Sequence, residues 1–396
     1  MITTKIMYFN DTRTYYDFKD RTFSGYLKTE VVKECKKKIL DCRPETAIFL
    51  AFELMACGET KRVFSIIEWI YTKKIGIMNP VFPFRFFRRF KQYLLLRKNI
   101  LESNGQFSKK GFKKSDIERM TDLSLRNSIS LRNHIAELIT ICCDSRKETI
   151  KSIPKYKPEE FQSNVIRQKI RTKDRDFVSR FIRPGDSPEI RMAMNEIAWA
   201  IHEKKTEHFK YWLGWLFQWE AMLLKNGIKL NCAPRNHIHN TIDAKDVTWL
   251  VWEILLHFAS KMENKIYQNV SALYALYKYD WTTTKKKGRI CYMLIVFDYL
   301  TQLYSIHKPI TSDTSRYIKN SAYYLPIIEQ MKKKEIVEEK SSLFKIDEMK
   351  KREELITKEE LPLSEKQREK RRKKIEVKKS EAKLLTVHKL DSQLSR

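Results

Sequence analysis

Three groups of basic residues, each close to aromatic residues, could bind phosphate groups. The first group contains Arg85, Arg88, Arg89 and Lys91, the second contains Arg167, Lys169, Arg171, Lys173 and Arg175, and the third contains Lys285, Lys286, Lys287 and Arg289. Lysine and arginine side chains that neutralise nucleic-acid phosphates release condensed counterions, and this release favours binding. The three groups therefore predict non-covalent recognition of a DNA or RNA backbone, without readout of base sequence.

Each group also has a simpler interpretation. Helical spacing places three arginines of the first group on one face of a helix and Phe86, Phe90 and Tyr93 on another, which is equally typical of an amphipathic helix with a solvated basic face. The second group lies in a charged connecting segment. The third precedes a strongly apolar helix, where backbone N–H groups could join the lysines in binding an anion. For both of these groups, the alternative is that the basic side chains lie in loops and face solvent without binding a ligand.

Motifs of phosphate-loop, dinucleotide-binding and hydrolase enzymes are absent from the sequence. The chain contains nine glycines, and it has no G-x-x-x-x-G-K-[ST] loop, no G-x-G-x-x-G turn after a strand and no G-x-S-x-G elbow. Cys142 and Cys143 follow His134 by about two helical turns, whereas a nucleophile and its base need direct contact, so these cysteines are expected to be core thiols. We predict no catalytic residues, no cofactor and a non-enzymatic function.

Two sets of residues leave a metal site open as an alternative. Cys232, His237 and His239 offer zinc ligands, but a closed zinc site needs four ligands and no further pair lies nearby in the sequence. Nuclease carboxylates that hold two metal ions could come from four loop acids, namely Asp174, Asp176, Asp243 and Asp246. Adjacent acids in charged loops are usually solvated, so the chain is predicted to hold no metal.

The elements that must position these groups are helices. Apolar residues recur at steps of three and four before residue 330, without sustained alternation, and this predicts an all-α fold. Helical pairs are expected at Glu30 to Leu40 with Thr46 to Ala56, and at Glu189 to His202 with Glu207 to Leu224. Further helices are expected at Lys61 to Lys73, Phe84 to Leu101, Asp122 to Asp144, Val247 to Glu263, Lys265 to Leu276 and Arg289 to Ser305. The predicted fold is an irregular or solenoid-like array of helical hairpins. The similarity of the two pairs indicates either two duplicated halves or a resemblance that any two amphipathic hairpins share.

Composition divides the chain into four predicted regions. They are an N-terminal helical domain (1–146), a basic connector (147–186), a C-terminal helical domain (187–330) and a charged tail that is helical or disordered (331–396). Five glutamates within apolar helical stretches are expected to be partly buried and to pair with arginines such as Arg126 or Arg132. These glutamates are Glu53, Glu68, Glu137, Glu196 and Glu253.

The net charge of +29 on 396 residues belongs mainly to the helical body. Residues 331–396 carry a net charge of +7, with 21 Lys and Arg against 14 Asp and Glu, so residues 1–330 carry +22. Seven cysteines without regular spacing are expected to be reduced thiols in a cytosolic compartment. The sequence shows no signal-peptide core and no apolar run of the length of a membrane span, which predicts a soluble, unexported protein.

Several stretches of the chain resemble, in this order, a family of uncharacterised helical proteins of nucleocytoplasmic large DNA viruses. The resemblance covers about Phe23 to Lys334 and is carried by "ETAIFLAFELMACGETKRVFSIIEWIYTKKIGIMNPVFPF", "LRNSISLRNHIAELITICCDS", "MNEIAWAIHEKKTEHFKYWLGWLFQWE", "DVTWLVWEILLHF" and "KKKGRICYMLIVFDYLTQLYSIHKPI". It rests on many aromatic and glutamate positions and not on one sharp motif. The resemblance implies a viral factory in the host cytoplasm, or the virion, as the location.

The leading functional prediction is a non-enzymatic basic viral protein that binds nucleic-acid backbone non-specifically. Its role would be that of an accessory of viral replication, transcription or packaging, or of an internal virion component. The alternative is a helical scaffold or adaptor that binds an acidic viral partner during virion assembly. A continuous groove would favour nucleic acid, whereas evenly scattered charge would favour general solubility. The residues expected in such a groove are Arg85, Arg88, Arg89, Arg171 and Lys286.

Overall fold

The computed structural model describes residues 13–103, 113–150, 153–173, 175–235, 238 and 243–302.

Proline and glycine mark the turns between the N-terminal helices. Helices α1 (Lys28–Leu40), α2 (Pro44–Ala56) and α3 (Thr60–Ile70) follow one another through short links. Pro44 opens α2, where the missing N–H has no intrahelical acceptor to lose. Gly58 follows α2 with a φ of +83°, and a Cβ there would lie 3.2 Å from the Leu123 nitrogen, so this turn requires glycine.

The aromatic face of α4 packs inward as the sequence predicts. A π-helical turn (Tyr71–Ile75) and a 3-10 turn (Gly76–Met78) lead from α3 into α4 (Phe82–Ser103). Phe86, Phe90 and Tyr93 are buried, and their rings lie 5.0 to 6.0 Å from that of Phe64 on α3, centre to centre. Aromatic burial therefore fixes which side of α4 faces the core.

The helix expected from Asp122 to Asp144 is interrupted in the structure. It is divided into α5 (Lys114–Ser124), a 3-10 turn (Leu125–Asn127) and α6 (Ile129–Asp144). Ser128 has extended backbone and its hydroxyl accepts a hydrogen bond from the Leu131 N–H, so a new N-cap begins α6. Continuous apolar spacing conceals this break, because Leu125 and Leu131 are both buried.

The connecting segment runs from α6 to the second set of helices with little regular structure. It contains a 3-10 turn (Pro158–Phe161), α7 (Ser163–Lys169) and a second 3-10 turn (Ser179–Phe181). Tyr156 donates its N–H to the Gln218 side chain of α9 and accepts from the same side chain. Gly214 of α9 permits this approach, because a Cβ at that position would lie 2.2 Å from Ile153.

Five helices complete the described part of the chain. They are α8 (Pro188–His202), α9 (Thr206–Lys225), α10 (Thr248–Ser260), α11 (Asn264–Lys278) and α12 (Thr283–Thr301), with a 3-10 turn (Asp243–Lys245) before α10. Trp212, Trp215, Trp249 and Trp252 are buried on α9 and α10. Helix α12 begins at Thr283 and not near Arg289 as predicted, so the third basic group lies within its first two turns.

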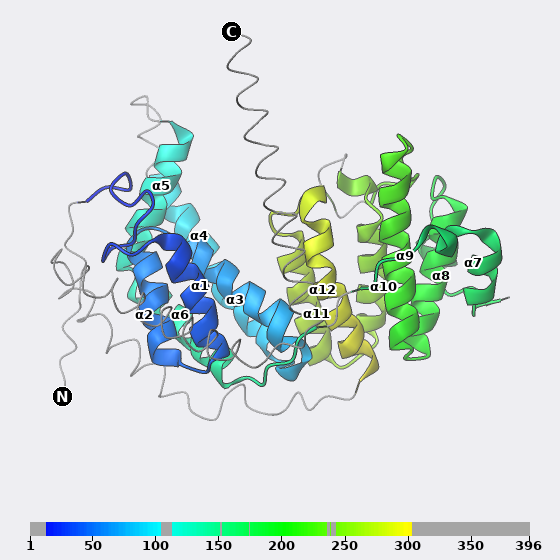
Figure 1. Ribbon diagram of the computed structural model, residues 1–396, viewed down its shortest axis with the longest axis horizontal. Helices are drawn as coiled ribbons and strands as arrows, with labels where there is room; N and C mark the ends of the chain where they lie inside the picture. Colours follow the sequence, from blue (N-terminus) through cyan, green and yellow to red (C-terminus); the bar gives the residue numbers. More distant parts are fainter. Residues whose placement is uncertain are drawn as a thin grey trace, which may run out of the picture. The chain divides into compact units, whose positions relative to one another are not determined.

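Helices from both predicted halves pack against each other. Figure 1 shows α11 and α12 beside α3, and α11 also packs against α4. The hydroxyl groups of Tyr71 and Tyr299 are 2.8 Å apart, and the Tyr292 hydroxyl donates to the Glu68 carboxylate. The all-α array of hairpins is confirmed for the described residues, which contain twelve α-helices and no β-strand. The predicted domain boundaries and the duplication stay predictions, and the tail (331–396) lies outside the described residues.

Candidate nucleic-acid interface

The second basic group is the one whose charged side chains all reach solvent. Arg167, Lys169, Arg171, Lys173 and Arg175 are exposed, and we refer to these five residues as the connector strip. The strip runs from the end of α7 toward the 3-10 turn Ser179–Phe181, next to α8 and α9 (Figure 1). The Lys169 Nζ atom lies 5.2 Å from the centre of the Tyr211 ring, a cation–π contact. Exposed cations are the groups that can meet phosphates without first breaking an internal ion pair.

Glu196 of α8 holds the backbone of the connector strip. Its fully buried carboxylate accepts hydrogen bonds from the Arg171 N–H at 2.9 and 3.0 Å, and from the Thr172 N–H and hydroxyl at 2.9 and 2.7 Å. The His208 Nε2 atom lies 2.5 Å from the same carboxylate. Burial acts to raise the pKa of Glu196, but the hydrogen bonds from His208 and Thr172 outweigh it and leave the pKa below its ordinary value.

Asn195, the residue of α8 directly before Glu196, fixes the far end of the connector strip. The Asn195 amide donates to the Arg175 carbonyl at 2.8 Å and accepts from the Phe177 N–H at 2.7 Å. Asp176 accepts from the Val178 and Ser179 N–H groups, each at 2.9 Å, and from Arg191 at 2.6 Å. The backbone of the strip is therefore bonded inward on α8, while its basic side chains remain exposed.

In the first group, two of the four cations are ion-paired within the protein. Arg85 and Arg89 both bind the carboxylate of Glu137 on α6, which is buried, and the Arg89–Glu137 distance is 2.8 Å. Arg89 also lies 3.0 Å from His134, and burial together with this guanidinium lowers the pKa of His134. Glu137 therefore pairs with arginines, as expected for the buried glutamates, but these arginines are Arg85 and Arg89 of α4 and not the examples named from the sequence, Arg126 and Arg132. Arg88 and Lys91 are exposed.

Three of the four cations of the third group are bound within the protein. Lys286 is only 7% exposed, and its ammonium group binds Glu220 and lies 2.7 Å from Asp246 and 4.7 Å from the centre of the Phe217 ring. Arg289 donates to the carbonyl of Tyr279 at 2.8 Å, near the C-terminus of α11, where unpaired carbonyls favour a cation. Lys285 pairs with Asp280 at 3.0 Å, and Lys287 is exposed.

The geometry leaves the connector strip as the candidate interface, together with Arg88, Lys91 and Lys287 as isolated exposed cations. No family model, curated protein or solved structure matches this chain. The site is therefore assigned from the contacts of its own residues. In the part of the chain that the structure describes, no helix is long and apolar enough to cross a membrane.

The candidate metal ligands are not brought together among the described residues, where no three His, Cys, Asp or Glu side chains are grouped for a metal ion. Asp176 binds Arg191 and Asp246 binds Lys286, so both carboxylates already have cationic partners. Cys232 is buried next to Arg235, and burial raises the pKa of its thiol to about 12. His237, His239, Asp174 and the side chain of Asp243 lie outside the described residues.

The carboxylates and the amide that organise the basic groups were only partly visible in the sequence. Glu137 and Glu196 stand out there as acids within apolar stretches, and both are buried. Glu220, Asp246 and Asn195 carry no such signal, because Glu220 and Asn195 are single polar residues within helices and Asp246 lies in the link before α10. Their roles follow from partners that are distant in the sequence.

Replacing Lys286 with methionine is expected to lower the free energy of unfolding by about 2–3 kcal/mol, because Glu220 and Asp246 lose the cation between them. Burial already raises the pKa of Glu220, and Lys286 acts against this rise. The affinity for nucleic acid is expected to stay within about twofold of wild type. Urea unfolding and an anisotropy titration measure the two quantities. A large loss of affinity in a fully folded variant would instead place Lys286 in the interface.

Proposed function

We propose that this chain is a non-enzymatic basic protein that binds the backbone of DNA or RNA without sequence preference, through the connector strip. The observation that carries the proposal is the combination of five exposed cations with a backbone held in place by Glu196 and Asn195. A fixed backbone reduces the entropy that the strip loses on binding, and exposed cations release counterions from phosphates. The net charge of +22 on residues 1–330 supports long-range attraction of a polyanion.

The biological role that we propose is an accessory of viral replication, transcription or packaging, or an internal component of the virion. It rests on the resemblance to helical proteins of large DNA viruses together with the basic charge. The corresponding location is the viral factory in the host cytoplasm, or the particle itself. Mass spectrometry of purified virions and of infected-cell cytoplasm would distinguish these two locations.

The decisive experiment is a titration of the full chain against labelled 30-mer duplex DNA, single-stranded DNA and RNA in 50 and 200 mM salt. Five phosphate contacts predict a slope of about −4.5 in log affinity against log salt for duplex DNA, or roughly a 500-fold loss between these concentrations. Scrambled sequences are expected to bind equally well. Absence of binding at 50 mM salt contradicts the proposal.

A surface next to α9 favours the alternative of a scaffold that binds an acidic protein. Leu224 and Ile228 are exposed at the C-terminal end of α9, beside the exposed Lys225 and Lys229. Apolar side chains among lysines suit an acidic amphipathic segment of a viral partner. Stoichiometric capture of one protein that survives nuclease treatment, and that is lost in Leu224→Ser, would support this second function.

A further inference from the structure

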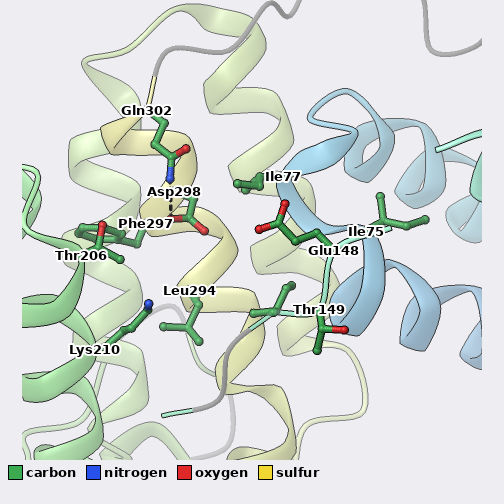
Figure 2. A pocket seen from close by; sticks show the side chains of 11 residues that line it. Ile75, Ile77, Glu148, Thr149, Thr206, Lys210, Leu294, Phe297, Asp298 and Gln302 are labelled. Carbon is green, nitrogen blue, oxygen red and sulfur yellow. Dashed lines mark hydrogen bonds between the residues drawn. The ribbon is translucent and has the colours of Figure 1, made fainter. Parts of the chain in front are cut away.

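A cavity of about 210 Å³ lies between the turns that follow α3 and the helices α9 and α12. Figure 2 shows its apolar walls, to which Ile75 and Ile77 contribute from one side and Leu294 and Phe297 from α12. The ionisable side chains that line it are Glu148, Asp298 and Lys210. The cavity belongs to none of the basic groups considered above.

Asp298 is a largely buried carboxylate at the edge of this cavity. It accepts a hydrogen bond from the Gln302 amide at 3.1 Å, and no Lys, Arg or His of the described residues lies within 4 Å of it as an ion pair. Lys210 is the basic residue that lines the cavity, and its ammonium group binds the exposed Glu207 at 2.9 Å. Burial raises the pKa of Asp298 to about 6, with Lys210 opposing this rise and Glu148 adding to it.

Glu148 provides a second carboxylate on the opposite wall. Its N–H donates to the Lys74 carbonyl at 2.6 Å, and the Ile150 N–H donates to the Lys73 carbonyl, so this stretch of the connecting segment is held against the π-helical turn. In Figure 2 the carboxylate of Glu148 points into the space in front of Asp298. Two carboxylates against one lysine make the lining net negative in a chain of net charge +29.

We propose that this cavity binds a small organic cation, with a primary ammonium group between Asp298 and Glu148 and an apolar body against Ile75, Leu294 and Phe297. Hydrogen bonds from an ammonium group to carboxylates are among the stronger ones in proteins, and the loss of solvent around Asp298 strengthens the attraction. An apolar cavity of about 150 Å³ holds benzene, so 210 Å³ suits a ligand of roughly seven to ten non-hydrogen atoms.

Other ligand classes fit the cavity less well. An anion would be repelled by the two carboxylates. An amino acid zwitterion would need a cation to bind its carboxylate, but the lysine in the lining, Lys210, is already paired with Glu207. Among the described residues no three His, Cys, Asp or Glu side chains are grouped for a metal ion. The charge and the apolar walls together select an amine.

The test is isothermal titration of the full chain with hexylammonium chloride at pH 7.5, with hexanol and hexanoate as matched controls. We expect saturable one-to-one binding of the amine, at least tenfold weaker binding of hexanol and none of hexanoate. Asp298→Asn is expected to weaken amine binding at least tenfold. Glu102→Gln, which removes an exposed carboxylate on α4, is expected to leave it unchanged.

The pH dependence adds a second readout. Binding requires the ionised form of Asp298, so the affinity is expected to be constant above pH 7 and to fall about tenfold per unit well below pH 6, with proton release when the amine binds near pH 6. Equal affinities for hexylammonium and hexanol, or an unchanged affinity in Asp298→Asn, overturn the proposal. So does the absence of saturable binding at millimolar amine. Nucleic-acid affinity is measured separately, so either proposal can fail without the other.

Discussion

Replacing Asp186 with alanine is expected to lower the free energy of unfolding by about 3–5 kcal/mol, the cost of leaving a buried ion-pair partner alone. The side chains of Asp186 and Arg235 are both fully buried, and two N–O distances between them are 2.8 and 2.9 Å. Asp186 also accepts from the N–H groups of Arg183 and Ala233, each at 2.8 Å. Without the carboxylate, Arg235 retains the hydrogen bond to the Phe181 carbonyl at 2.9 Å, a weak contact to the Cys232 sulfur at 3.9 Å and a more distant contact to Glu253 at 3.6 Å.

The lowered pKa of Asp186 also predicts the direction in which stability changes with pH. Burial opposes ionisation of Asp186, but hydrogen bonds from Arg183, Ala233 and Arg235 outweigh it and lower its pKa below the ordinary value of 3.8. A lowered pKa in the folded state stabilises the fold above the ordinary value, and this stabilisation is lost as the pH falls through the folded-state pKa. The wild type is therefore expected to lose stability below about pH 4 more steeply than the variant.

Urea unfolding monitored by tryptophan fluorescence measures both effects. Asp20→Ala, at an exposed aspartate, is the control and is expected to change stability by less than about 0.5 kcal/mol. Asp186→Asn keeps the size of the side chain and should still cost about 2 kcal/mol or more, because an amide cannot neutralise Arg235. A loss below about 1 kcal/mol in Asp186→Ala would show that the buried pair contributes little.

The helices were predictable because apolar spacing reports local geometry. Ser187 and Pro188 mark the start of α8 in the sequence, and the structure places an N-cap and a first-turn proline there. The start of α12 was missed, because Thr283 to Gly288 contains no apolar residue and reads as a loop. In the structure Lys286 is buried there against Glu220 and Asp246, so tertiary contacts decide where this helix begins.

The basic groups were visible in the sequence, but the division between internal and exposed cations was not. Arg85 finds its partner 52 residues away at Glu137, and Lys286 finds Glu220 at a separation of 66 residues. Nothing in local spacing reports such distances. An internal ion pair removes one charge of each sign, so these pairs leave the excess of +22 on residues 1–330 unchanged. That excess must lie on other side chains, and the connector strip is therefore a stronger candidate for the interface than the two groups in which cations are paired internally.

The amine cavity had no counterpart in the sequence for the same reason. Glu148 and Asp298 are 150 positions apart, and each is an ordinary acid in its own segment. Asp298 follows a continuous apolar run on α12, which indicates burial of the helix but not a cavity beside it. Only the packing of the connecting segment against the turns after α3 brings the two carboxylates to one space.

Replacing Arg171, Lys173 and Arg175 together with glutamine is expected to lower affinity for duplex DNA roughly 100-fold or more at 0.1 M salt, and to reduce the salt slope by about 3. These three exposed residues supply cations from the middle of the connector strip. Their structural contacts run through the main chain, since Glu196 binds the Arg171 N–H and Asn195 binds the Arg175 carbonyl. The substitutions therefore remove charge and leave the anchoring bonds in place.

The matched control removes three exposed lysines at another place, in the variant Lys98→Gln, Lys113→Gln and Lys114→Gln. Both triple variants carry the same net charge, so a difference between them measures position and not total charge. We expect the control to lose less than about fivefold in affinity and less than about 1 in slope, because its lysines contribute only to the distant field. Equal losses in the two variants would mean that the basic surface acts as a whole, and would remove the connector strip as the interface while leaving non-specific binding intact. Anisotropy titrations at four salt concentrations, with circular dichroism to verify the helical content of each variant, separate these outcomes.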